Sequence, residues 1–134
     1  MANTTFSGPV RSENGFEQVT KNATTGVFTT SATYDATIIG GVQSLSGAGA
    51  VDLTNLITEL TTTGANALTL ADGTTSGQVK IVNMIVDGGD GTLTPVTFAN
   101  GTTITFDAVA ESVTLVWNSA IGWVATSVNG ATVA

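Results

Sequence analysis

The chain has no cysteine and no histidine, and only three of its 134 residues are lysine or arginine. The lack of cysteine excludes disulfide staples and thiolate metal sites. The net charge is −7, and the three cations, Arg11, Lys21 and Lys80, are scattered. Nucleic-acid binding draws on several contacts between basic side chains and phosphates, and anionic membranes are disfavoured for the same reason. We therefore expect neither nucleic acid nor membrane among the partners.

Long apolar runs are missing as well. No run of about 18 apolar residues is present that could span a bilayer. The opening MANTTFSGPVRSENGF lacks the charged-then-apolar pattern of a signal peptide. These absences predict a soluble chain that is made in a cytoplasm.

Threonine carries the polarity that charge does not supply. Charged residues make up 10% of the chain, against a usual share of about 25%, while apolar residues make up 42%. There are 26 threonines, and this β-branched residue favours half-buried pleated surfaces. The length suits one domain with a single core. Composition alone therefore predicts an all-β protein.

Two regions differ in pattern. Residues 1–36 hold two of the three cations and three of the five phenylalanines, and neither helical nor strand periodicity holds there for long. We interpret residues 1–36 as an extended N-terminal arm and residues 37–134 as a β-strand module; the alternative for the arm is a disordered terminus. The arm residues expected to dock on a partner are Phe6, Val10, Phe16, Val19 and Phe28.

Short apolar or alternating segments separated by turn signals fill the module. Their number and spacing, without a convincing helix, predict an antiparallel β-sandwich, a jelly-roll-like fold or a small β-barrel. Residues 53–60, LTNLITEL, also fit two helical turns, with Leu53, Leu56, Ile57 and Leu60 on one face, although strand is favoured there. The predicted strands are 50–53, 56–62, 67–71, 78–87, 92–99, 102–108, 112–118 and 122–128.

Three local signals refine this prediction. The segment 78–87 is apolar on both faces after Lys80, which is typical of a central strand covered on both sides. Asn100-Gly101 between two alternating runs is a strong hairpin signal. Pro95 removes a ladder donor, so we expect its strand to lie at an edge or to carry a bulge.

The segment DGGDG, residues 87–91, is the most conspicuous candidate for a metal site. A calcium loop of the EF-hand type needs acidic or amide ligands at positions 1, 3 and 5 and a glutamate at position 12. Here those later positions hold Gly89, Gly91 and Phe98, so the match fails. A tight turn explains the same residues, because glycine adopts positive φ and aspartate caps turns. Calcium binding by Asp87 and Asp90 stays open as a minor alternative.

The sequence offers little for catalysis. Without histidine or cysteine the remaining options are carboxylate pairs, Tyr34 or the lysines, and sugar-cleaving grooves are usually lined with several aromatic rings. Trp117 and Trp123 lie in strand patterns where core packing is the favoured role. We expect no enzyme activity and no cofactor. The T-x-T segments at 92–94 and 103–105 resemble parts of ice-binding arrays, but their irregular spacing favours simple β-propensity.

Several longer segments of the sequence together resemble a known type of module. The pieces are "ALTLADG", "GQVKIV", "DGGDGTLTP", "FANGTTITFDAVAESVTLVW" and "GWVA" within residues 64–128, together with the opening "FSGPVRSENGF" of residues 6–16. They resemble a β module found in virion proteins of tailed phages, many from marine and cyanobacterial phages. The resemblance covers most of the chain and is one of pattern and phrase, with no active-site motif.

What the resemblance implies is a capsid decoration, or cement, protein or a related small head protein on the virion surface. Such proteins commonly form trimers that lock neighbouring capsomers, so the major capsid protein and further copies of the chain become the expected partners. The alternative is a tail or fibre module that binds a glycan on the host surface; its sign would be an exposed tryptophan or tyrosine beside aspartate or asparagine in a groove.

Overall fold

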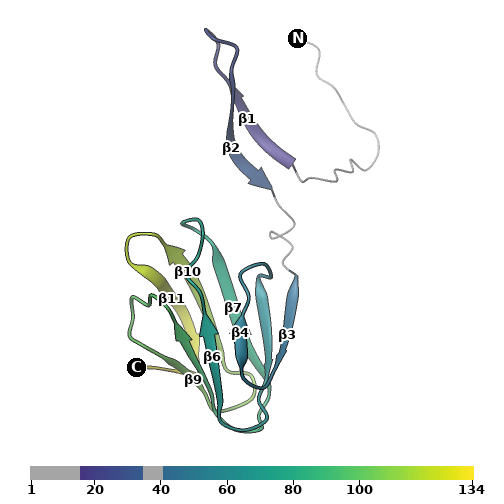
Figure 1. The fold of residues 1–134 in the computed structure, drawn as a ribbon, viewed down its shortest axis with the longest axis vertical. Helices are drawn as coiled ribbons and strands as arrows, with labels where there is room; N and C mark the ends of the chain where they lie inside the picture. The colour runs from purple at the N-terminus through teal and green to yellow at the C-terminus, as the bar shows by residue number, and fades with distance from the viewer. Residues whose placement is uncertain (1–15, 35–40) are drawn as a thin grey trace, which may run out of the picture. The chain divides into compact units, whose positions relative to one another are not determined.

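A computed structural model describes residues 16–34 and 41–134, with side chains in the first range placed only for residues 22–27. The chain divides into two compact units, Met1–Ile38 and Ile39–Ala134. Strands, turns and bends make up the described residues (Figure 1). Across these ranges no helix is long and apolar enough to cross a membrane.

The first unit contains an antiparallel hairpin of β1 (Phe16–Lys21) and β2 (Phe28–Tyr34). Its turn is built on Asn22, whose side-chain oxygen accepts the backbone N–H groups of Thr24 and Thr25 at 2.9 and 3.0 Å. Gly26 completes the turn at φ 73°, where a side chain would be strained. Part of the segment predicted as an extended arm is thus locally paired.

Two five-stranded sheets form the second unit, which confirms the all-β prediction and agrees with a β-sandwich. Sheet I has the order β11-β10-β7-β5-β3, and sheet II has the order β12-β9-β8-β6-β4. Neither sheet closes into a barrel. The strands are β3 Val42–Ser46, β4 Gly49–Val51, β5 Ile57–Thr61, β6 Asn66–Leu70, β7 Val79–Val86, β8 Gly91–Pro95, β9 Ile104–Phe106, β10 Ser112–Asn118, β11 Gly122–Asn129 and β12 Thr132–Val133.

The sheets are mixed rather than purely antiparallel as predicted. Successive strands from β3 to β8 alternate between the sheets, so β3, β5 and β7 run parallel in sheet I and β4, β6 and β8 run parallel in sheet II. Each pair of strands is one turn of a flattened coil. Strands β9 to β12 then close the unit with antiparallel pairs.

Inward-facing side chains from both sheets meet in one core. Alternation along each strand puts apolar residues inside, as the burial of every second residue in β10 shows. Burial of such side chains contributes about 1.5–3 kcal/mol each to folding. The buried apolar residues are Val51, Leu60, Leu68, Leu70, Val82, Met84, Leu93, Ile104, Phe106, Val113, Leu115, Trp117, Trp123 and Ala131.

Strand β7 lies at the centre of sheet I, as predicted, but only one of its faces is covered by the described residues. Lys80, Val82 and Met84 point inward and are buried. The alternate face is exposed or half-buried, with Val79 36% and Ile85 45% exposed. Within the second unit the prediction of cover on both sides is therefore wrong, because the described residues of this unit cover only the inner face of β7.

Pro95 does not mark an edge strand, and that prediction is wrong too. It is the last residue of β8, which lies in the middle of sheet II. The N–H of Val96 donates to the Leu70 carbonyl at 2.9 Å, so the missing donor of Pro95 points to the other neighbour, β9. Antiparallel pairing with β9 reaches only Leu93, so no ladder bond is lost at the proline.

Asn100-Gly101 lies in the link between β8 and β9, which do pair antiparallel, but the tight two-residue hairpin is wrong. The link runs from 96 to 103. Its Asn100 side-chain oxygen accepts the N–H of Ala125 at 2.8 Å, and Phe98 forms a bridge with Trp123. Contacts with β11 thus define this link, and they override the local turn preference.

One residue in the described part carries a conformational strain that substitution can remove. Ala110 has φ 72° and is the one non-glycine residue with positive φ there. Alanine at positive φ costs of order 1 kcal/mol or more, and glycine does not bear that cost. We expect Ala110→Gly to raise the free energy of unfolding by at most about 1 kcal/mol. The greater unfolded-state entropy of glycine offsets part of the gain from the relieved strain.

Chemical denaturation of the wild type and the variant measures the change. Ala108→Gly is the matched control, because Ala108 is exposed and lacks positive φ, and it should lower stability slightly. Equal destabilisation by both glycines would contradict the assignment of strain to Ala110.

Candidate interaction surface

The DGGDG segment links β7 of sheet I to β8 of sheet II. Asp87 caps it, since its Oδ1 accepts the N–H of Gly89 at 2.9 Å, and Thr62 Oγ1 accepts the N–H of Gly88 at 2.9 Å. A Cβ on Gly88 would lie 2.4 Å from the Thr62 carbonyl oxygen. The glycines therefore let this link pass directly beside the preceding turn of the coil, at residues 62–64.

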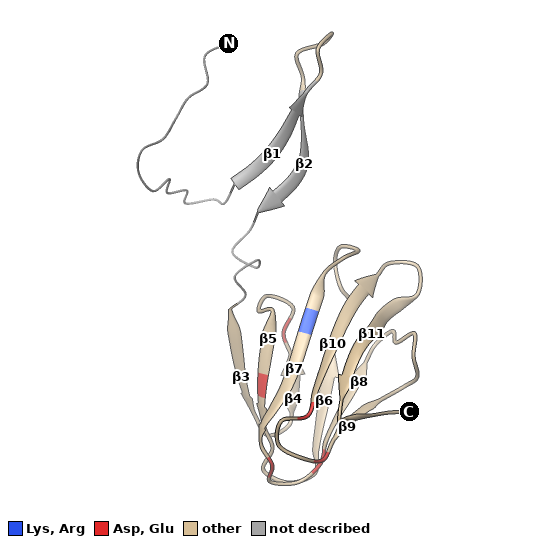
Figure 2. Ribbon diagram, turned by 180° about the vertical axis from the view of Figure 1, so that it is seen from behind, with Lys and Arg blue, Asp and Glu red and all other residues tan. Residues whose placement is uncertain are grey.

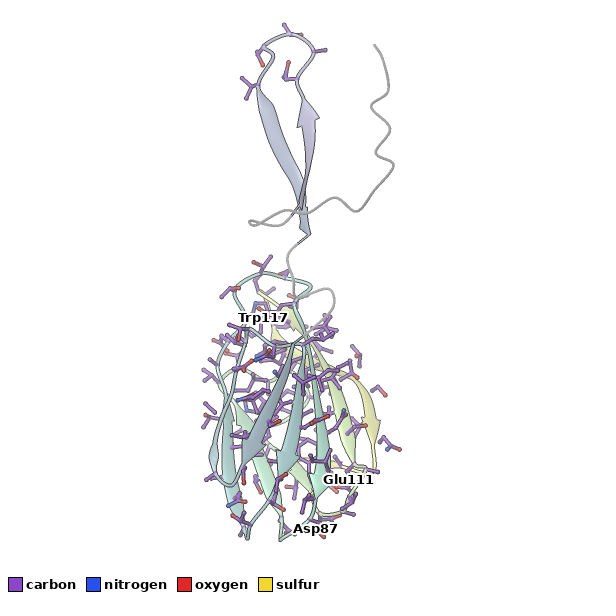
Figure 3. The ribbon with its side chains drawn as sticks, turned by 90° about the vertical axis from the view of Figure 1, so that its right-hand side faces the viewer. Asp87, Glu111 and Trp117 are labelled. Carbon is purple, nitrogen blue, oxygen red and sulfur yellow. The ribbon has the colours of Figure 1, made fainter. Side chains whose placement is uncertain are left out.

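Acidic residues do not gather into a site in the described chain. Over residues 22–27 and 41–134, whose side chains the structure describes, there is no group of three or more Asp or Glu side chains placed to hold a metal ion. Glu111 is buried and structural, because its Oε2 accepts the N–H of Asp107 at 2.7 Å. Asp87 and Glu111 lie at one end of the second unit and Trp117 at the other (Figure 3). Asp35 lies outside the described residues.

Both tryptophans belong to the core, which confirms the sequence prediction. Trp117 and Trp123 are 7% and 0% exposed, and their rings meet edge to face with centroids 5.4 Å apart. The indole N–H of Trp123 donates to the Ala71 carbonyl at 2.9 Å. Neither ring can therefore serve as an exposed stacking platform for a sugar.

A buried lysine fastens the loop between the first two turns of the coil. Lys80 is 1% exposed, and its Nζ donates to the Asn55 carbonyl at 2.8 Å and lies 3.5 Å from Asp52 Oδ1. The Asp52 carboxylate also accepts the backbone N–H of Asn55 at 2.8 Å and its Nδ2 at 2.6 Å. The pair orders this loop against β7.

Burial acts on the pKa of both groups. It lowers the pKa of Lys80 below its ordinary 10.5, and the nearby Asp52 carboxylate offsets this only in part. Burial also acts to raise the pKa of Asp52, but the hydrogen bonds from Asn55 and the charge of Lys80 together hold it below 3.8. The sequence predicted Lys80 only as a residue of a strand and did not predict that it orders the loop. The signal for that role was a lysine on the same strand face as Val82 and Met84.

The outer face of sheet I carries an apolar strip. Strand registers place Val42 beside Ile57, Ile57 beside Ile81, and Val79 beside Val116. Val42 is 49% exposed, and the other side chains of the apolar strip, which are named below, are half-buried or exposed. Monomeric soluble proteins rarely expose contiguous apolar patches without a use for them. The apolar strip comprises Val42, Ile57, Val79, Ile81, Val116 and Val124.

Small uncharged side chains cover the outer face of sheet II. Thr92 lies opposite Thr105, and Thr69 lies opposite Thr94, so the two T-x-T segments occupy adjacent strands despite their uneven spacing in the sequence. The outward residues of its strands are Ala50, Ala67, Thr69, Thr92, Thr94, Thr105 and Thr132. This face is uncharged and only weakly apolar.

Little charge lies on either face. Glu59 on β5 is the one acidic residue within strands β3 to β12, and it lies on the outer face of sheet I beside Ser44 and Asn83. Lys80 on β7 is the one cation in these strands (Figure 2), and its side chain is buried. The remaining acidic residues of the described part of this unit lie in its loops. Both broad faces are thus suited to contact with uncharged surfaces.

The predicted arm residues are only partly accessible to description. Phe6 and Val10 lie outside the described residues. Phe16 and Val19 fall on β1 and Phe28 begins β2, so the hairpin brings the backbones of these three into one small sheet. Their docking role stays a prediction.

Comparison with known proteins adds no relative. No protein-family model matches the chain, and no curated protein matches it either.

Close approach of the DGGDG link to residues 62–64 predicts a steric penalty. We expect Gly88→Ala to lower the free energy of unfolding by about 1–3 kcal/mol, because its Cβ would meet the backbone of the neighbouring turn. Asp90→Asn is the control and should change stability by less than about 0.5 kcal/mol, as Asp90 is exposed. Thermal melts with and without Ca²⁺ compare both variants; a calcium-dependent loss in Asp90→Asn would contradict the turn.

Lys80 predicts an unusual alkaline behaviour. Because its pKa is lowered in the folded chain, the unfolded chain binds more protons in the alkaline range below 10.5, so the free energy of unfolding rises with pH there. We expect Lys80→Met to remove this rise and to lower the free energy of unfolding at neutral pH by about 1–3 kcal/mol, because the Asn55 carbonyl loses its donor. Urea midpoints across that range measure it, and an unchanged slope in the variant would assign the effect to another group.

Proposed function

We propose that the chain is a non-enzymatic structural protein of a phage virion, which decorates and stabilises the capsid as a small homo-oligomer, with three copies as the expected number. The observation that carries the proposal is the apolar strip on the outer face of sheet I. It lies in a unit whose described acidic residues form no cluster and whose tryptophans are buried. Such a surface serves association rather than chemistry.

The proposal divides the work between the two units. The apolar strip brings copies of the second unit together. The face that carries it has one carboxylate and no exposed cation, so charge repulsion between two such faces is weak. The arm, through Phe6, Val10, Phe16, Val19 and Phe28, then contacts the major capsid protein or a neighbouring subunit. Spaced apolar anchors on an extended segment suit such docking.

Stabilisation of the shell follows from mass action. A protein that binds only the assembled shell stabilises it by RT ln(1 + [L]/Kd) at each site. Several weak contacts within one oligomer strengthen each other, since the second contact forms at a high effective concentration. Strong individual contacts are not needed for a large effect on the particle.

The glycan-binding alternative has less support. It needs exposed aromatic rings near polar side chains, and both tryptophans are buried. No observation on the described residues favours it over association.

Light scattering of the purified chain, followed by co-pelleting with undecorated shells of the phage concerned, tests the proposal. We expect an oligomer that pellets with shells. Ile81→Lys places a charge in the middle of the apolar strip and should reduce pelleting at least tenfold, since desolvating one lysine opposes association. Thr94→Lys adds the same charge on sheet II and serves as the matched control.

Removal of residues 1–36 addresses the arm separately. It should abolish pelleting while the melting of the β module is retained. A wild-type monomer that stays in the supernatant would overturn the proposal, and unchanged pelleting without residues 1–36 would overturn the role of the arm.

A further inference from the structure

Strand β3 is an edge strand with none of the usual protection. Native proteins blunt exposed edges with charge, proline, bulges or very short strands. β3 has five residues, VQSLS, with no charge, no proline and no register shift against β5. The other edges differ: β12 has two residues, β4 has three, and β11 pairs with a register shift near Leu115.

The free backbone groups of β3 can be assigned. Gly41 accepts from the N–H of Ile57, and the N–H of Gly47 donates to Thr61 at 2.9 Å. Parallel pairing therefore directs the odd-numbered residues of β3 toward β5. The N–H and C=O groups of Val42, Ser44 and Ser46 point the other way, and all three residues are exposed.

This edge is held in place without a partner. The Gln43 side chain points inward, where its Nε2 donates to the Ala50 carbonyl at 2.8 Å and its Oε1 accepts from Thr58 Oγ1 at 2.8 Å. The layer beneath is nevertheless incompletely covered. Leu45 is only half-buried, whereas Leu60, its neighbour one strand further in, is 0% exposed. One more strand on β3 would complete this layer.

Each chain also contains a pair of strands that lacks a larger sheet. β1 and β2 form a sheet of their own, and an isolated two-stranded hairpin is marginally stable in water. The sequence of β1 includes two charged residues, Glu17 and Lys21, while that of β2, FTTSATY, includes none. Their register shifts once, between Gln18 and Val19, where β2 carries one extra residue, Ser31, so that residues 28–30 and 32–34 of β2 pair regularly on either side of this bulge.

We propose that the free edge of β3 is the acceptor for the hairpin of a second copy, which pairs through β2 and extends sheet I. Each copy supplies one donor and one acceptor, so the contact is heterologous and closes into a ring when the rotation permits. Pairing of β3 with β3 of a second copy would leave the hairpins without a sheet. The inference deepens the proposed self-association and does not depend on the shell.

Ser44→Pro in the full-length chain tests this inference by light scattering over a range of concentrations. The variant removes a free edge N–H and no internal hydrogen bond, so folding should persist. Ser44→Thr keeps the N–H and is the matched control. We expect the wild type and Ser44→Thr to be oligomers and Ser44→Pro to shift to monomer with an unchanged far-UV spectrum. An oligomer that survives Ser44→Pro with its mass unchanged would overturn the inference.

Hydrogen exchange of the wild type supplies a readout that needs no variant. The amides of Ser44 and Ser46 should exchange at least tenfold more slowly at high than at low protein concentration. Protection that is independent of concentration in a monomer would identify the hairpin of the same chain as the occupant, and rapid exchange in an oligomer would leave the edge unpaired; either result overturns the inference. Shell pelleting remains a separate readout, because an oligomer with protected amides that ignores shells contradicts only the decoration.

Discussion

The second unit depends on one constraint, that each strand from β3 to β8 crosses to the opposite sheet before the next turn of the coil begins. This crossing makes the strands of one sheet parallel and places the links one above another. The glycines of the link at 87–91 are needed because neighbouring turns approach within contact distance there. Lys80 holds another link, the one between β4 and β5, through its hydrogen bond to the Asn55 carbonyl. Core, links and open edge all follow from this arrangement.

The same constraint decides where the surfaces lie. A coil of two sheets buries the inner face of each strand and leaves the outer faces to solvent, so side-chain alternation becomes a division between core and contact surface. Sheet I then presents the apolar strip and sheet II presents threonine and alanine. The first turn of the coil leaves β3 at the edge of sheet I, with β5 as its neighbour on one side and no described strand on the other.

Sequence patterns predicted the local structure better than the connections between strands. The strand at 112–118 was predicted with its observed bounds, and the burial of Trp117 and Trp123 was predicted from their places in two strand patterns. The coil was not predicted because the steps from Val42 to Ile57 and from Ile57 to Ile81 differ in length, so no fixed period marks it. β3 was missed because VQSLS is short and rich in serine. Pro95 misled because its missing donor points beyond the end of β9.

The apolar strip shows why a surface is harder to predict than a core. The two apolar faces of β7 were visible in the sequence, but only the registers with β5 and β10 show which face is inside. Alternation along a strand shows only that successive side chains lie on opposite faces of the sheet. Which of the two faces is buried depends on where the other sheet packs. The candidate surface is therefore a property of pairing that no single segment carries.

Burial of Lys80 has a consequence for the behaviour of many copies together. Because it is the one cation in the second unit and is enclosed, the accessible charge of that unit is of a single sign. Copies in dilute buffer repel one another at long range, and dissolved salt shortens that repulsion to about 10 Å at 0.1 M. Raising the ionic strength therefore lets the uncharged faces of different copies come into contact, whereas charge repulsion holds the copies apart at low ionic strength.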